Sequence, residues 1–198
     1  MKLNEFTEQN SLVQEVQELP SFQRWFRKSR AKNHNGSPKV LYHFTDAKDN
    51  FKLFHPFSHF GTMNSANHRY IDIQAAQDQD SSHRIVPVFL SVQNPLDIPD
   101  VVDHDLLGYL SLFSNMSEFR KDIQRIFNDY DRVSDVYYRH EPKGFLEISR
   151  LVQAKGYDSF RYINKYEDKG SISYVILKPA QAIPVGKFLQ ELINKTKE

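Results

Sequence analysis

The chain has 198 residues and no cysteine, which excludes disulfides, a thiolate nucleophile and a cysteine-ligated zinc site. Its 26 lysine and arginine residues nearly balance 25 aspartate and glutamate residues, giving a formal net charge of +1. This balance argues against a nucleic-acid footprint spread over the whole domain. The length suits one domain with a helical extension. We find no signal peptide and no apolar run long enough to cross a bilayer, so we expect a cytoplasmic fold.

The N-terminal part is predicted to be helical. Apolar spacing from Thr7 to Leu19 indicates a helix that Pro20 ends. A second short helix follows, with Ser21 as its N-cap and an aromatic docking face: Phe22, Trp25 and Phe26. Basic side chains surround that helix: Arg24, Arg27, Lys28 and Arg30. They are most simply a solvated face, with an anion patch that recruits nucleic acid as the alternative.

A short β-prone run from Lys39 to Thr45 carries His43 into a polar turn. A histidine at the end of a buried strand is positioned by the scaffold, which favours a function that needs a fixed ring. A hydrogen-bonded structural histidine is the alternative interpretation.

The remaining elements do not alternate regularly between strand and helix, which favours an α+β fold. Residues His55 to Thr62 read as a shaped loop, and Thr62 can cap a helix from Asn64 towards Gln77. Further strands are expected at Arg84 to Val92, Tyr157 to Ile163 and Ser173 to Leu177. Further helices are expected at Asp103 to Phe113, Ser117 (as cap) to Asp129, Phe145 to Val152 (closed by Gly156), and Lys187 to Lys195.

Several short motifs occur in an order that identifies a family. They are Phe22-x-x-Trp25-Phe26, Val40 to Thr45, His59-Phe60-Gly61-Thr62 with Ala66 and Arg69, Asn94-Pro95-Leu96, Gly156-Tyr157-Asp158, Asn164 to Glu167, and Ser173 to Ile176. In this order the chain resembles the ADP-ribosyltransferase-like domains of bacterial and phage polyvalent proteins and effectors. These are related to the histidine-type transferases that include the poly(ADP-ribose) polymerases and diphtheria toxin. Each motif is short, and the resemblance runs from residue 21 to residue 184.

The resemblance implies split antiparallel β-sheets around a nicotinamide adenine dinucleotide (NAD) cleft. It divides the chain into an N-terminal helical extension at 1–20, the transferase-like domain at 21–186 and a C-terminal helix at 187–198. A helical insertion is expected at 103–138. This insertion matches no motif, so acceptor recognition is assigned to it by elimination.

The resemblance also implies roles for residues of the cleft. The His43 imidazole would bind the 2′-hydroxyl of the nicotinamide ribose, and the backbone of Phe44 would pair with the carboxamide. Phe60 would be the stacking platform for nicotinamide, with His59 and Phe57 as alternatives. Other expected cofactor-binding residues are Thr45, Ser65, Arg69, Ser173 and Tyr174. Thr45 and Ser65 could equally be turn or cap residues, and Arg69 could face either the pyrophosphate or solvent.

Two residues depart from the family pattern. Phe44 stands where relatives have glycine, and Ser173 stands where polymerase-type relatives have glutamate. A neutral serine cannot stabilise the positive charge that develops as the glycosidic bond breaks. Glu167 is the nearest substitute for the catalytic acid, and Asp168 is the fallback. The loop that carries both could alternatively be a solvated hairpin tip.

These expectations describe an NAD-dependent mono-ADP-ribosyltransferase with NAD as its substrate and NAD glycohydrolysis as a side activity. The acceptor would be a protein, or alternatively a nucleic acid, and relatives of this kind often act as toxins or effectors delivered into another cell. The alternative is a catalytically inactive fold that serves as a binding module. A metal hydrolase is disfavoured because Pro56 interrupts the one close histidine pair, His55 and His59, and because no HExxH pattern occurs.

Overall fold

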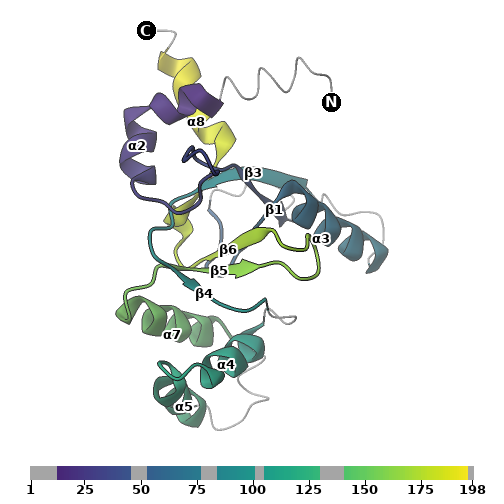
Figure 1. Cartoon of the computed structure of the whole chain (residues 1–198), viewed down its shortest axis with the longest axis vertical. Helices are drawn as coiled ribbons and strands as arrows, with labels where there is room; N and C mark the ends of the chain where they lie inside the picture. The colour runs from purple at the N-terminus through teal and green to yellow at the C-terminus, as the bar shows by residue number, and fades with distance from the viewer. Residues whose placement is uncertain (1–12, 46–52, 77–83, 101–104, 130–140, 196–198) are drawn as a thin grey trace.

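The computed structural model describes residues 13–45, 53–76, 84–100, 105–129 and 141–195. Two sheets occupy the middle of the molecule, with helices at both ends of its long axis (Figure 1). The helices are α2 (Pro20–Phe26), α3 (Met63–Ala76), α4 (Leu106–Asn115), α5 (Arg120–Asp129), α7 (Glu141–Ala154) and α8 (Val185–Lys195). This arrangement confirms the α+β class. None of the described helices could span a membrane, because none is both long and apolar enough.

The strands form two separate sheets. The three-stranded sheet has the order β1 (Leu41–Thr45), β3 (Arg84–Leu90) and β7 (Ala182–Pro184), and all its pairs are antiparallel. The four-stranded sheet has the order β2 (His59–Phe60), β6 (Ile172–Ile176), β5 (Ser159–Ile163) and β4 (Pro95–Asp97). Only its β4–β5 pair is parallel among the described strands. The expected split of the sheet is therefore present.

A single-residue bridge between Tyr42 and Gly61 joins the two sheets beside His43. The Tyr42 N–H donates to the Gly61 carbonyl at 2.9 Å, and the Gly61 N–H donates to the Tyr42 carbonyl at 3.1 Å. On its other side Tyr42 lies opposite Pro87 of β3. The backbone groups of Tyr42 point away from β3, so a proline without an N–H fits there at no cost in hydrogen bonds.

Three apolar clusters hold these layers together. One fills the space between the sheets, with Leu41, Phe60 and Val88 among its members. A second packs α4, α5 and α7 against the outer face of the four-stranded sheet, and a third joins α2 and α8 to Phe89 of β3. The second cluster gives the region of the expected helical insertion an extensive core that includes α7.

The ends of the chain pack on each other through α2 and α8. Phe22 stacks on Phe26 at 5.2 Å and meets Phe188 edge-on at 5.1 Å between ring centroids. The expected N-cap role of Ser21 was wrong. Pro20 occupies the first helical position, Leu19 is the cap without a side-chain bond, and the Ser21 hydroxyl donates instead to Glu191 of α8 at 2.8 Å.

Element boundaries agree with the expectations in most places. Thr62 caps α3 as predicted, because its Oγ1 accepts from the Ser65 N–H at 3.2 Å. Gly156, with φ +91°, ends the turn after α7. Ser117 does not cap α5, which begins three residues later at Arg120. Parts of the predicted elements lie outside the described residues: 7–12, 77, 103–104, 130–138 and 196–198.

Candidate active site

A cavity of about 410 Å³ lies where β1, β2, the start of α3 and the end of the β5–β6 hairpin meet. Eight residues expected in the site line it: His43, Phe44, Thr45, Phe60, Ser65, Arg69, Glu167 and Ser173. The alternatives His59 and Phe57 line it as well. The fold therefore brings together residues that are more than 100 positions apart in the chain.

His43 is held at the wall of this cavity by backbone and aromatic contacts. Its Nδ1 lies 2.8 Å from the His59 carbonyl oxygen. A carbonyl can only accept, so Nδ1 carries the proton and Nε2 is the acceptor of the neutral ring. The imidazole also packs edge-on against Phe54 at 5.2 Å and, with its plane tilted, against Phe60 at 5.1 Å. Its orientation is thus fixed by the neighbouring strand and by the core.

The Phe60 ring supports His43 from the core. It is 1% exposed and packs against Phe54 at 5.1 Å as well as against the imidazole. A stacking platform for nicotinamide needs an accessible ring face, and both His59 and Phe57 are half-buried rather than buried. The role of Phe60 as platform stays a prediction, and the burial of its ring favours the two alternatives.

His59 is clamped between two tyrosines. Its Nδ1 lies 3.1 Å from the Tyr162 hydroxyl, and its Nε2 lies 3.3 Å from the Tyr109 hydroxyl. Burial raises the pKa of both phenols well above the ordinary value, so both stay protonated at neutral pH. Because Tyr109 belongs to α4, this contact ties the helical end of the molecule directly to the cavity wall.

Phe57 adds a second connection to the helices. Its φ of +66° places it in the left-handed region, which costs free energy for a residue with a side chain. The ring packs against Phe145 of α7 at 4.5 Å and Tyr109 at 5.1 Å, and the N–H donates to the Ile176 carbonyl at 2.7 Å. These contacts hold the strained loop beside the cavity.

Ser173 is buried in a polar network. It is 2% exposed, and its Oγ accepts from Asn164 Nδ2 at 2.7 Å. The Ser173 side chain also counteracts part of the rise in the pKa of Tyr162 that burial causes. Asn164 thus fixes the Ser173 hydroxyl in the wall of the cavity.

Gly61 has no room for a side chain at this point. A Cβ there would lie 2.2 Å from Ser65 Oγ and 2.6 Å from Ser173 Oγ. Both hydroxyls are held in place, since Ser65 Oγ donates to the Thr62 carbonyl at 3.0 Å and Ser173 Oγ accepts from Asn164. Ser65 therefore makes the hydrogen bond of a helix-start residue and also lines the cavity. The presence of glycine at position 61 of the His59–Thr62 motif is explained by the lack of space for a Cβ.

The two acidic residues of the β5–β6 hairpin, Glu167 and Asp168, make different contacts. Glu167 lines the cavity, and its negative charge adds to burial in raising the pKa of Tyr162. Asp168 does not line it; its Oδ2 accepts from Thr62 Oγ1 at 2.5 Å, which ties the hairpin to the start of α3. Glu167 is thus the carboxylate of the cavity wall, and its role as the catalytic acid stays a prediction.

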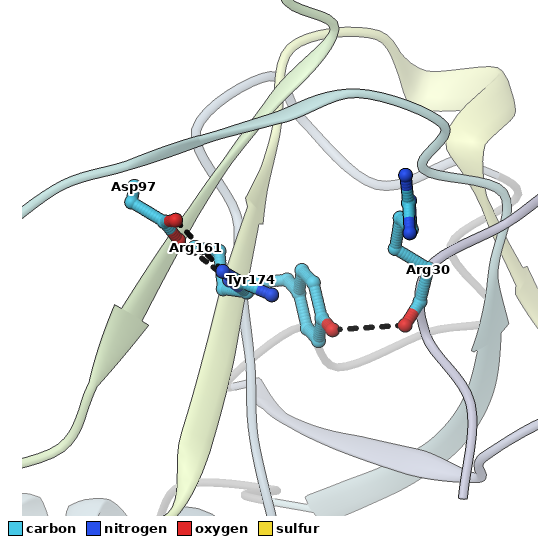
Figure 2. A network of polar contacts seen from close by, with 4 residues as sticks. All are labelled: Arg30, Asp97, Arg161 and Tyr174. Atoms are coloured by element: carbon cyan, nitrogen blue, oxygen red, sulfur yellow. Dashed lines mark hydrogen bonds and ion pairs between the residues drawn. The ribbon is translucent and has the colours of Figure 1, made fainter.

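Tyr174 lies on the opposite face of β6 from Ser173, because successive residues of a strand alternate. It was expected in the site but does not line the cavity. Its ring packs in the core between the sheets, and its hydroxyl donates to the Arg30 carbonyl at 3.1 Å. Figure 2 shows Tyr174 beside the two-pronged contact of Arg161 with Asp97, at 2.5 and 2.7 Å. Tyr174 therefore anchors the segment after α2.

Charged and metal-binding groups are few at the cavity. Among the described residues that line it, Arg69 is the one guanidinium or ammonium group. His55 and His59 line it too, but no cluster of three histidine, aspartate or glutamate side chains that could hold a metal occurs within the described ranges.

The comparison that decides the family is a match over residues 33–183 to the family described as ADP-ribosyltransferase in polyvalent proteins. The chain belongs to this family. No curated protein and no solved structure matched the sequence. The ADP-ribosyltransferase match includes β1 to β6 and the whole cavity, and it leaves α2 and α8 outside.

Sequence reasoning missed the tyrosine clamp of this ADP-ribosyltransferase domain. Tyr109 sits in an apolar helical stretch with no polar pattern around it, so nothing in the sequence marks it. Tyr162 and Asn164 could have been found, since both lie on or next to the strand that leads into the Glu167 hairpin.

Proposed function

We propose that the cavity binds NAD+ and that the protein transfers a single ADP-ribose unit to a macromolecular acceptor. The observation that carries this proposal is the meeting of His43 and Glu167 in one cavity of about 410 Å³ in a chain of this family. That volume is within the range of small-molecule sites. The lining also fits a dinucleotide, since it combines aromatic rings, hydroxyls, one cation and one carboxylate.

The first strand offers two contacts to the nicotinamide riboside half. His43 Nε2 would accept from a ribose hydroxyl, because Nδ1–H is committed to the His59 carbonyl. The backbone groups of Phe44 point to the same edge of β1 as those of Tyr42, two residues earlier, and that edge borders the cavity. An N–H and a C=O side by side match a primary carboxamide. The Phe44 ring packs against Tyr70 of α3 at 6.0 Å.

Two charged side chains of the cavity, Arg69 and Glu167, would interact with charged parts of the dinucleotide. Arg69 would face the pyrophosphate, and Glu167 would stabilise the positive charge on the ribose as the C1′–nitrogen bond breaks and nicotinamide leaves. A nucleophile of the acceptor then bonds to C1′ and loses its proton. With water as the nucleophile the products are ADP-ribose and nicotinamide. The work of the site is orientation and charge stabilisation.

Two assays test the proposal. One measures the release of nicotinamide from NAD+, and the other measures the transfer of labelled ADP-ribose to macromolecules of a cell lysate. His43→Ala and Glu167→Gln should each abolish both signals. Matched controls are His68→Ala, on the exposed face of α3, and Glu118→Gln, before α5; both should keep wild-type activity. Full activity in both cavity variants would refute the assignment of the site.

A binding module without catalysis is the second candidate, favoured by the buried Ser173 in the place of an acid. Calorimetry separates the two: heat on NAD+ addition without nicotinamide release identifies a module that binds NAD+, and the absence of heat excludes the transferase. An effector or toxin role is proposed with the transferase. It predicts that expression slows growth of a target cell and that His43→Ala does not.

A further inference from the structure

The distribution of charge along the chain is strongly uneven. Residues 19–45 contain no aspartate or glutamate and six basic residues: Arg24, Arg27, Lys28, Arg30, Lys32 and Lys39. The other 20 basic residues stand against all 25 acidic residues, so the rest of the chain has a formal net charge of −5. The near-neutral total therefore conceals one cationic segment, which we call the basic segment (24–39).

The side chains of the basic segment are accessible. Five of the six are exposed and Lys39 is half-buried. The ion pairs found within the described part of the chain, Lys155 with Asp122 and Arg161 with Asp97, include none of them. Within that part of the chain, their charges are consequently not neutralised by an ion pair.

The backbone that carries them is ordered. The Arg30 N–H donates to the Val92 carbonyl at 2.6 Å, and the buried Ser29 hydroxyl donates to the Leu90 carbonyl at 2.6 Å. The Lys39 N–H donates to the Ala31 carbonyl at 3.0 Å, which folds the segment back on itself. The Lys32 ammonium lies 5.9 Å from the centre of the Phe26 ring, so it returns over α2. These contacts bring Lys32 and the segment that leads from Lys39 into β1 back towards α2, which carries Arg24.

A purely structural reason accounts for only part of this charge. Cations at a helix C-terminus interact favourably with the helix dipole, which explains Arg24 and Arg27 at the end of α2. Arg30, Lys32 and Lys39 lie beyond the helix and have no such reason. The Tyr174 hydroxyl bonds the backbone carbonyl of Arg30, and in Figure 2 the Arg30 guanidinium extends away from that carbonyl. The charged side chain is therefore not needed for the bond to Tyr174.

The surroundings of the charges indicate which polyanion fits. Proteins that lie on a membrane surface add exposed apolar side chains to their basic ones. Here Phe22 and Phe26 are buried, and the Trp25 Nε1–H donates to the Ala180 carbonyl at 2.8 Å. Half of the basic side chains are arginines, whose planar fork binds phosphate oxygens in pairs. We propose that the basic segment binds the phosphate backbone of a nucleic acid.

Fluorescence anisotropy with a labelled single-stranded RNA, a single-stranded DNA and a duplex DNA tests this without NAD. It therefore succeeds or fails independently of the proposed transferase activity. Six phosphate contacts predict a slope of log K against log salt of about −5 on duplex DNA and about −4 on single strands. Affinity for duplex should fall about a thousandfold between 50 and 200 mM salt.

The variant that tests the assignment combines Arg24→Gln, Lys28→Gln and Arg30→Gln, three exposed side chains. It should halve the slope of log K against log salt, so that affinity for duplex DNA falls only about 40-fold between 50 and 200 mM salt. The matched control combines Lys121→Gln, Arg125→Gln and Arg150→Gln, which are equally exposed on α5 and α7. It should bind as the wild type does.

The proposal is overturned if none of the three nucleic acids binds at 50 mM salt, or if the two triple variants bind alike. It is also overturned if polyglutamate competes as well as nucleic acid at equal charge, or if vesicles with anionic lipid bind more tightly. Circular dichroism spectra that match the wild type show that loss of binding in the first triple variant is not loss of fold.

Discussion

Replacing Gly61 by alanine should destabilise the protein at the junction of its two sheets. The added Cβ would lie 2.2 Å from Ser65 Oγ and 2.6 Å from Ser173 Oγ, both far inside van der Waals contact. At least one hydroxyl must move. Neither can move freely, because one donates to the Thr62 carbonyl and the other accepts from Asn164.

The expected cost follows from these contacts. Breaking one or two buried neutral hydrogen bonds costs about 0.5–1.5 kcal/mol each, and inserting one carbon into a filled core costs about 1–3 kcal/mol. We expect the free energy of unfolding to fall by about 2–4 kcal/mol. Nicotinamide release should fall as well, because the bridge to Tyr42 lies beside His43.

Urea unfolding followed by circular dichroism measures the loss, and Gly186→Ala is the matched control. Gly186 lies in α8, and a Cβ added there would meet nothing within 4 Å. Alanine at this position should therefore stabilise the helix by about 0.5–1 kcal/mol. Equal effects of the two glycine substitutions would refute the reasoning.

A second variant identifies the contact that matters. Ser65→Ala removes the nearer hydroxyl, so the double variant Gly61→Ala/Ser65→Ala should be more stable than the sum of the single effects predicts. A favourable coupling of about 1 kcal/mol or more is expected. Additive effects would show that the alanine is accommodated by some other movement.

Three further outcomes follow from the described contacts. Imidazole nitrogen NMR should show the Nδ1–H tautomer for His43. Tyr109→Phe should perturb the His59 ring signals and leave those of His43 unchanged, and it should cost about 0.5–1.5 kcal/mol of stability. Burial raises the pKa of Tyr109 and Tyr162 above the ordinary 10.0, so the folded state keeps protons that the unfolded state loses above about pH 10. Stability should therefore fall as pH rises past that point, and in urea titrations Tyr109→Phe should make the decline shallower by about 1.4 kcal/mol per pH unit. Phe188→Ala, which empties the aromatic contact between α8 and α2, should cost about 3–5 kcal/mol in the same assay; a loss below about 1 kcal/mol would show that α8 is a dispensable tail.

The sequence was most informative where local signals are strong. The helix after Thr62 has its cap, its length and its polar start in one continuous stretch, and the structure reproduces it within one or two residues. The order of the motifs led to the right family although each motif is short. The motifs at 40–45, 59–69, 164–167 and 173–176 contribute residues to one cavity. The strands β2, β4 and β7 were not predicted. With two or three residues each, they have no periodicity, and distant partners define them.

The direction in which a strand side chain points was the second feature that the sequence did not predict. Ser173 and Tyr174 are neighbours in the motif, yet the alternation of β6 sends one into the cavity and the other into the core. The burial of Phe60 has the same origin, since His59 faces the other way on β2. Which of two neighbouring side chains faces the cavity depends on the register of the strand against its partner strand. That register depends on contacts between segments that are far apart in the sequence.

The Tyr42–Gly61 bridge is reinforced from both sides. Beside it His43 Nδ1 donates to the His59 carbonyl, and behind it a shared apolar cluster lies between the two sheets. Moving the imidazole away from Glu167 would therefore require this cluster to open. On heating, we expect the geometry of the cavity to be lost together with the fold and not before it.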